Sequence, residues 1–338
     1  MMTLVTGGSG YIGSHACIEL IQQGHKIIVV DNLINSSIQA IKQIELITKS
    51  SFIFVEGDVR DESLLSQVFT DHKISNVIHF AGLKAVGDSS NDPLSYYDNN
   101  ISGVLTLLKV MKLFGCKNLV FSSSASVYGS QSELPIPETA SLSTLNPYGR
   151  SKLIIEKILG DLYSSDKLWN IAILRYFNPV GAHASGMIGE SPNSKPNNLF
   201  PIVSETAAGK RSFIEIYGDD YPTIDGTGVR DYIHIMDLVR GHLSALNMFS
   251  QNGCIFSVNL GTGTGYSVLE IIKEFESIAG RSIPFKITGR RTGDAPSCFA
   301  DVAYAKSLMG WNSKLTLTKM CEDQWRWQNS TFCKKTSN

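Results

Sequence analysis

Short apolar runs alternate with helical patterns through the first half of the chain. The runs are rich in Val, Ile and Leu, and the segments between them repeat apolar residues every three to four positions. Strands alternating with helices in this way form a parallel sheet with helices on both faces, so we predict an α/β fold built on a Rossmann-type doubly wound sheet. The predicted strands are 3–6, 26–30, 52–55, 76–80, 118–121 and 170–174, with a long helix from Pro93 to near Gly115 and another after Pro147.

The alternation breaks in the second half of the chain. Residues 181–201 and 218–228 are rich in Gly, Pro, Asn and Ser, which is typical of loops. Ser267, with Glu270 three residues later, has the form of a capping box that opens a helix. We therefore expect a smaller α/β substrate-binding domain beside the first. The predicted domains are 1–177 and 178–338, with 232–259 a candidate for return to the first domain.

Bulk composition narrows the function classes. The chain has 338 residues, which exceeds a typical single core, and its formal net charge of −1 comes with no basic block, so nucleic acid is not an expected partner. No apolar run approaches the roughly 20 residues that cross a bilayer, and no signal-peptide pattern opens the chain, so we expect a cytoplasmic protein without a membrane partner. The six cysteines lack C-x-x-C spacing, so no metal is predicted.

A glycine-rich turn follows the first predicted strand and precedes a helix. Gly7, Gly10 and Gly13 would let backbone N–H groups approach a pyrophosphate at the helix N-terminus. A plain strand-to-helix turn is the alternative, but the position at the start of a β-α-β unit favours dinucleotide binding. Asp31, after the second strand, would accept ribose hydroxyls and repel a 2′-phosphate, which favours NAD over NADP. Asp58, after the third strand, lies where an adenine edge would be.

Tyr148 and Lys152 form the candidate catalytic pair. They are one helical turn apart, in a helix that Asn146 and Pro147 can open, so both side chains can point into one site. A free tyrosine at pH 7 is phenolate in about one molecule in 1,000, a cost of roughly 4 kcal/mol. A nearby ammonium favours the phenolate, and so would the positive charge of an oxidised nicotinamide. The alternative is an ordinary amphipathic helix face. Ser124, at the end of a strand, could hydrogen-bond the same substrate hydroxyl and relay its proton.

Longer motifs carry a resemblance over nearly the whole chain. They are similar to the extended nucleotide-sugar branch of the short-chain dehydrogenase/reductase superfamily and, within it, to the UDP-glucose 4-epimerase family, also called UDP-galactose 4-epimerases. Besides the glycine-rich turn, the matching segments are 31–32, 56–58, 80–84, 96–100, 122–124, 175–182, 196–199 and 225–234.

The resemblance implies a homodimeric isomerase of carbohydrate metabolism that binds NAD and a UDP-hexose. Tyr148 would deprotonate the sugar 4-hydroxyl while carbon 4 gives its hydride to NAD, and the hydride would return to the other face. Implied cofactor residues are Gly7, Gly10, Tyr11, Ile12, Gly13, Asp31, Asn32, Asn35, Ser36, Asp58, Val59, Phe80, Ala81, Gly82, Lys84, Asn99, Ser122, Tyr148, Lys152 and Phe177. Implied substrate residues are Lys84, Ser124, Tyr148, Asn178, Asn198, Leu199, Tyr217, Arg230, Arg291, Asp294 and Cys298.

Two positions refine the expected activity. Related dehydratases place an Asp-Glu pair after the serine, whereas this chain has Ala125 and Ser126, which argues against a dehydratase. Many bacterial family members have Tyr where Cys298 stands, so the resemblance implies room for the acetamido group of UDP-GlcNAc and UDP-GalNAc, unless neighbouring side chains fill the gap.

The sequence leaves two rival functions open. The rivals are an NAD-dependent dehydrogenase with net turnover and a non-catalytic NAD-binding regulator. His79 and His234 lie in apolar runs and receive no functional role.

Overall fold

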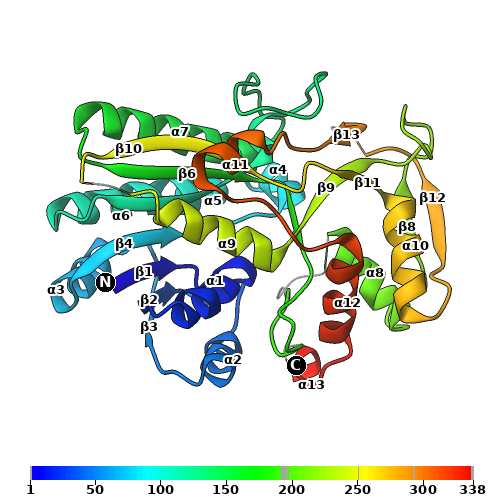
Figure 1. Cartoon of the computed structure of the whole chain (residues 1–338), viewed down its shortest axis with the longest axis horizontal. Helices are drawn as coiled ribbons and strands as arrows, with labels where there is room; N and C mark the ends of the chain where they lie inside the picture. The colour runs from blue at the N-terminus through cyan, green and yellow to red at the C-terminus, as the bar shows by residue number, and fades with distance from the viewer. Residues whose placement is uncertain (1, 192–195, 197, 250, 292–293, 336–338) are drawn as a thin grey trace.

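The computed structural model describes residues 2–191, 196, 198–249, 251–291 and 294–335. Its largest element is a sheet of seven parallel strands in the order β10-β6-β5-β4-β1-β2-β3 (Figure 1). Chain order reverses between β1 and β4, which creates the switch point where ligands bind in such sheets. The predicted fold class is therefore confirmed. The strands are β1 (Met2–Thr6), β2 (Lys26–Asp31), β3 (Ile53–Glu56), β4 (Ile74–His79), β5 (Asn118–Ser124), β6 (Asn170–Tyr176) and β10 (Cys254–Leu260).

Helices cover both faces of this sheet, which is why its central strands are apolar on both sides. One core packs beneath α1, α2 and α9, and the other beneath α3, α6 and α7. Asp61 accepts a hydrogen bond from Leu64 N–H at the start of α3, the capping role its position suggests. The helices are α1 (Tyr11–Gln22), α2 (Ile38–Thr48), α3 (Glu62–Asp71), α6 (Gly103–Leu113), α7 (Pro147–Ser165) and α9 (Ile235–Leu246).

The long helix predicted from Pro93 is interrupted. It consists of α5 (Pro93–Tyr97), a π-helical turn at Asp98–Ser102, and α6. A π turn widens the helix by one residue and re-aims the side chains on either side of it. Asn99 and Asn100 both lie in this turn, and Asn99 lines the cavity while Asn100 is buried.

The second lobe is built from short strands and three amphipathic helices (Figure 1). The predicted capping box is present: Ser267 Oγ accepts from Glu270 N–H, and the Glu270 carboxylate accepts from Ser267 N–H. Helices α8 (Leu199–Ala207), α10 (Val268–Ala279) and α12 (Leu317–Gln328) share one apolar core. The strands are β7 (Asn178–Val180), β8 (Ile214–Tyr217), β9 (Val229–His234), β11 (Gly265–Ser267), β12 (Phe285–Thr288) and β13 (Ser297–Cys298).

The chain crosses from the second lobe back to the large sheet. Tyr232 to His234 still belong to β9, which pairs with β7, β11 and β13. The return begins with α9 and continues through β10, which pairs with β6 along seven residues. The remaining short helices are α4 (Val86–Asn91), α11 (Ala303–Met309) and α13 (Thr331–Lys335).

Candidate active site

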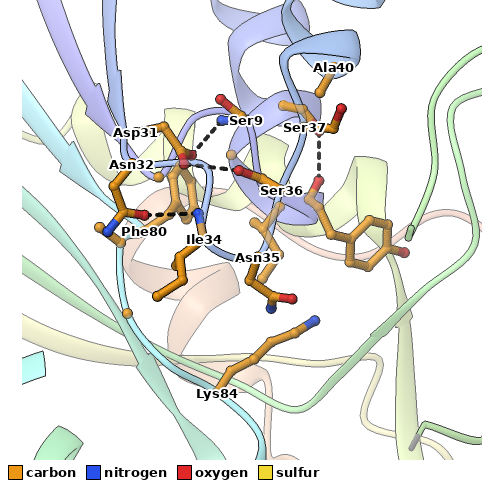
Figure 2. A pocket seen from close by; sticks show the side chains of 18 of the residues that line it. Ser9, Asp31, Asn32, Ile34, Asn35, Ser36, Ser37, Ala40, Phe80 and Lys84 are labelled. Carbon is orange, nitrogen blue, oxygen red and sulfur yellow. Dashed lines mark hydrogen bonds between the residues drawn. The ribbon is translucent and has the colours of Figure 1, made fainter. Parts of the chain in front are cut away.

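An elongated cavity opens beyond the carboxyl ends of β1, β2 and β4, between the two lobes. Figure 2 shows part of its lining, with Asp31 and Ser36 facing each other and Lys84 reaching in from the opposite side. Side chains not foreseen from the sequence, Tyr176, Glu190 and Trp327, also line it. The predicted residues that line it are Gly7, Gly10, Tyr11, Ile12, Gly13, Asp31, Asn32, Asn35, Ser36, Val59, Phe80, Ala81, Gly82, Lys84, Asn99, Tyr148 and Lys152.

The glycine-rich turn has no room for side chains. Gly7 has φ +70°, and a Cβ there would lie 2.6 Å from Ala81 N. A Cβ on Gly13 would lie 2.1 Å from Gly7 O. Among the described residues, no side chain caps α1 and no acidic side chain lies in its first turn, so the N–H groups of this turn face the cavity, with the Asp31 carboxylate on the neighbouring Ser9 N–H. This arrangement fits a dinucleotide pyrophosphate.

Asp31 is held in place by its own loop. Its Oδ2 accepts the Ser9 N–H at 2.9 Å, and its Oδ1 accepts the Leu33 N–H and the Ser36 Oγ hydrogen, each at 2.9 Å (Figure 2). The carboxylate is thereby fixed at the end of β2 with lone pairs toward the cavity. A fixed carboxylate suits two ribose hydroxyls and opposes a 2′-phosphate.

Three predicted cofactor residues lie beside the cavity rather than in its lining. The Asp58 carboxylate is engaged by Arg60 at 2.8 Å and by Asn32 Nδ2 at 2.9 Å, and the Arg60 guanidinium holds the pKa of Asp58 below its usual range. Ser122 Oγ is hydrogen-bonded to His242 Nε2 at 3.0 Å. Phe177 packs in a buried cluster with Tyr128.

Tyr148 and Lys152 lie in the first turns of α7 and face the cavity. Asn146 Oδ1 accepts the Gly149 N–H at 2.8 Å and Pro147 occupies the first helical position, so the helix begins as its sequence suggests. Lys152 Nζ donates to the Ser122 carbonyl at 2.8 Å and lies 5.9 Å from the centroid of the Tyr148 ring. The Ser124 hydroxyl interacts with the Tyr148 hydroxyl. The structure therefore brings the three predicted catalytic residues together.

The electrostatics of this trio bear on the two positive charges, Lys152 and an oxidised nicotinamide, that the sequence-based hypothesis gives to the phenolate. Burial raises the pKa of Tyr148, and the interaction with Ser124 opposes that rise only in part. Burial also lowers the pKa of Lys152 to about 8, against the opposing charge of Glu156. The ammonium alone therefore does not keep the phenol charged. A base at Tyr148 needs an additional positive charge close to the ring, which an oxidised nicotinamide would carry.

The π turn places two amides with different functions. Asn99 lines the cavity. Asn100 is buried, and its Oδ1 accepts the Leu83 N–H at 2.8 Å while its Nδ2 donates to the Leu83 carbonyl and to Ser151 Oγ. Asn100 thereby ties the cavity loop after β4 to α7, a positioning role that the sequence did not reveal.

The other eight predicted substrate residues lie in the second lobe, and none of them is among the described residues that line the cavity. Asp294 accepts from Arg291 Nε at 3.1 Å and lies 3.9 Å from an Arg230 nitrogen. The Arg291 guanidinium stacks 4.4 Å above the Tyr217 ring, and Cys298 is the strand partner of Arg230. Asn178, Asn198 and Leu199 lie at the starts of β7 and α8, on the same lobe.

Comparisons with known proteins identify the family. Residues 4–324 match the family model described as GDP-mannose 4,6 dehydratase. The chain is 52% identical over 330 residues to the UDP-glucose 4-epimerase of Bacillus subtilis, covering 98% of this chain and 97% of the relative. The chain belongs to the UDP-glucose 4-epimerase family.

Solved structures of UDP-glucose 4-epimerases share its fold. The enzyme from Bifidobacterium longum, in complex with NAD+ and UDP, has a TM-score of 0.94 at 50% identity, over 97% of this chain and 98% of that one. The UDP-Glc/GlcNAc 4-epimerase of Campylobacter jejuni has a TM-score of 0.85 at 34% identity, over 97% and 98% of the two chains.

The epimerase assignment agrees with the turn that follows β5. In this turn, Ala125–Val127, Ser126 accepts a hydrogen bond from Ser124 at 3.2 Å. Neither Ala125 nor Ser126 carries the carboxylate that elimination of water would need at this place. The site thus matches an epimerase rather than the dehydratase that gives the broad family model its description.

Proposed function

We propose that this chain interconverts UDP-glucose and UDP-galactose by inverting carbon 4 of the sugar. As a UDP-glucose 4-epimerase it is an NAD-dependent isomerase. The observation that supports these residues is that Tyr148 and Lys152 line the cavity that begins at the glycine-rich turn, while Ser124 lies beside Tyr148. Bound NAD supplies a hydride acceptor for carbon 4 and then the donor that returns hydride to its opposite face.

In this proposal Tyr148 takes the proton of the sugar 4-hydroxyl and later returns it. Ser124, whose hydroxyl interacts with that of Tyr148, orients the substrate hydroxyl and passes its proton. Lys152, anchored by the Ser122 carbonyl at 2.8 Å, holds a positive charge near the phenol and binds the nicotinamide ribose. Because each group ends the cycle as it began, no reagent is consumed.

The remaining predicted substrate contacts come from residues of the second lobe. Arg230 and Arg291 would grip the diphosphate of UDP, since guanidinium groups bind phosphate through paired donors. Asp294 already pairs with both arginines, so it would turn toward the UDP ribose when they bind phosphate. Asn178, Asn198 and Leu199 would contact the nucleotide sugar, and Tyr217 would support Arg291 from beneath.

Product identification tests the proposal directly. Purified protein is incubated with UDP-glucose without added NAD, and the sugar nucleotides are separated. We expect UDP-galactose to form while absorbance at the reduced-nicotinamide band stays constant. Steady growth of that band would instead indicate a dehydrogenase with net turnover, and absence of any product would contradict catalysis.

We also propose that the site accepts UDP-GlcNAc and UDP-GalNAc. The support is Cys298, a small side chain beside Arg230 where a tyrosine would occupy more volume. Burial raises the pKa of this thiol to about 11, so it would act by its size rather than as a nucleophile. Cys298→Tyr should abolish turnover of the acetylated sugars and retain UDP-glucose turnover, whereas Cys298→Ala should retain both. A wild-type chain inactive on UDP-GlcNAc would contradict the idea.

Assembly and cellular location are further predictions of the family resemblance. Within the part of the chain that the structure describes, no helix is both long and apolar enough to span a bilayer. The homodimer and the cytoplasmic location stay predictions, and light scattering of the purified protein measures the first.

A further inference from the structure

One carboxylate in the lining of the cavity, that of Glu190, contacts residues of both lobes. Glu190 lies between β7 and α8, and its Oε1 accepts a hydrogen bond from Lys84 Nζ at 2.8 Å and another from Asn198 Nδ2 at 3.2 Å. Lys84 follows β4 of the large sheet and reaches into the cavity (Figure 2), whereas Asn198 immediately precedes α8 in the second lobe. The Glu190 side chain therefore holds two residues that belong to different lobes.

The backbone of Glu190 is held by Trp327 of α12. Trp327 Nε1, on α12, donates to the Glu190 carbonyl at 3.1 Å. A Cβ on the preceding Gly189 would lie 2.5 Å from the Trp327 ring, so this segment packs directly on the indole. The Glu190 side chain is only 7% exposed. Its negative charge consequently stays at the cavity even when its partners move.

The link to Lys84 is easily broken. The Lys84 side chain is 44% exposed, and an ion pair with such an exposed partner contributes little to stability. An arriving diphosphate offers the ammonium a stronger, doubly charged partner. Once Lys84 turns to it, Glu190 is left beside an anion with no cation between them, which raises the free energy of the bound state.

We propose that Glu190 is a positioning residue that holds Lys84 and Asn198 across the cavity and whose charge weakens binding of the nucleotide sugar's diphosphate. The inference rests on the proposed function, because it assigns the exchangeable anion to a UDP-hexose. Asn198, on the substrate lobe, favours that ligand over the cofactor. Weakened binding keeps both sugars free to leave, which suits a reversible enzyme whose turnover can be limited by product release.

A charge-neutral variant tests this proposal. Glu190→Gln keeps the acceptor oxygen and the size but removes the charge. For the NAD-loaded protein we expect the Kd of UDP to fall about fivefold and the KM for UDP-glucose to fall in parallel, with no gain in kcat. Glu190→Asp keeps the charge and should bind UDP as the wild type does. Glu205→Gln, which removes a carboxylate paired with Arg211 in the same lobe, should change neither constant.

A second variant keeps the test decisive if Glu190→Gln does not fold. Lys84→Met should weaken UDP binding about tenfold, because the diphosphate would lose the ammonium that it takes from Glu190. An unchanged or weaker affinity for UDP in Glu190→Gln, or an unchanged affinity in Lys84→Met, overturns the proposal. A wild-type protein that binds UDP yet forms no epimer would contradict the proposed function and leave the role of Glu190 in UDP binding standing.

Discussion

Two groups of predicted site residues differ in burial: the catalytic wall, Tyr148 and Lys152, and the capturing wall, Arg230, Arg291 and Asp294 of the second lobe. On the catalytic wall, Tyr148 and Lys152 are 7% and 5% exposed, line the cavity and rest on the large sheet. On the capturing wall, which lies outside the lining of that cavity, the side chains of Arg230 and Arg291 are 23% and 56% exposed and share Asp294 as a partner. Burial fixes position and shifts pKa, whereas half-exposed arginines can exchange one anionic partner for another at little cost. The first wall suits proton transfer and the second suits reversible capture.

A buried ionic network stiffens the catalytic wall from beneath. Glu156 lies one turn beyond Lys152 on α7, and it pairs with Arg175 of β6 at 2.6 Å while accepting a hydrogen bond from Ser123 of β5. Arg175 continues to Tyr128 Oη at 3.1 Å. The network fixes α7, and with it the catalytic pair, against two strands of the sheet.

The largest effect should come from removing the phenol. Tyr148→Phe keeps the ring but lacks the proton acceptor, and loss of a positioned acid-base group costs about 1,000-fold in kcat. Bound NAD, measured after denaturing the protein, should match the wild-type content, because the glycine-rich turn and Asp31 are untouched. Retained turnover would favour a non-catalytic role for the helix face that carries Tyr148 and Lys152.

Breaking the network beneath this wall should cost stability. Glu156→Gln leaves Arg175 charged and buried, with side chains 5% and 6% exposed in the wild type, so the free energy of unfolding should fall by about 3 kcal/mol. Urea denaturation measures the loss. Glu205→Gln is the matched control, since that carboxylate is 27% exposed and its pair with Arg211 should contribute less than about 1 kcal/mol. Equal losses of unfolding free energy in both variants would show that the buried ion pair contributes no more stability than the exposed one.

The site features that the sequence predicts are those whose residues lie close together along the chain. The glycine-rich turn, Asp31 and the pair Tyr148 and Lys152 are defined by residues within one turn or at one strand end, so their pattern survives in the sequence. Side chains at strand ends were less predictable because they alternate between faces: on β5, Ser122 faces His242 while Ser123 faces Glu156.

Residues that act through distant partners could not be predicted. Glu156, Asn100 and Glu190 take their roles from residues 19, 17 and 106 positions away, on other elements. The π turn was not predicted either, although Asp98, Asn99 and Asn100 are weak helix formers, because the helix prediction rested on Pro93 and Gly115 as its ends. Local spacing therefore predicts the candidate reacting groups, and tertiary contacts supply the groups that hold them.

On the capturing wall, a single arginine should affect binding more than chemistry. Arg291→Ala removes charge-assisted hydrogen bonds to the diphosphate, which should raise the KM for UDP-glucose about tenfold and change kcat by less than about twofold. Steady-state kinetics separate the two constants. Arg290→Ala is the control, because Arg290 pairs with Asp220 at 2.7 Å and stacks on Tyr221. A fall in kcat without a change in KM would place Arg291 on the catalytic wall instead.

The smallest effect is the pH dependence of kcat/KM, which we expect to arise from the catalytic wall alone. Burial lowers the pKa of Lys152 to about 8, and the proposed mechanism needs the protonated ammonium. As pH rises through that value the charge is lost, so kcat/KM should drop about twofold from its plateau by pH 8 and continue to fall above it. A positively charged cofactor beside Lys152 would shift this alkaline limb to lower pH, never to higher pH. The Kd of UDP should stay level over the same range, because guanidinium groups in proteins are not deprotonated there. A flat kcat/KM from pH 8 to 10 would show that the ammonium is not required, and a parallel loss of UDP binding would place the titrating group on the capturing wall.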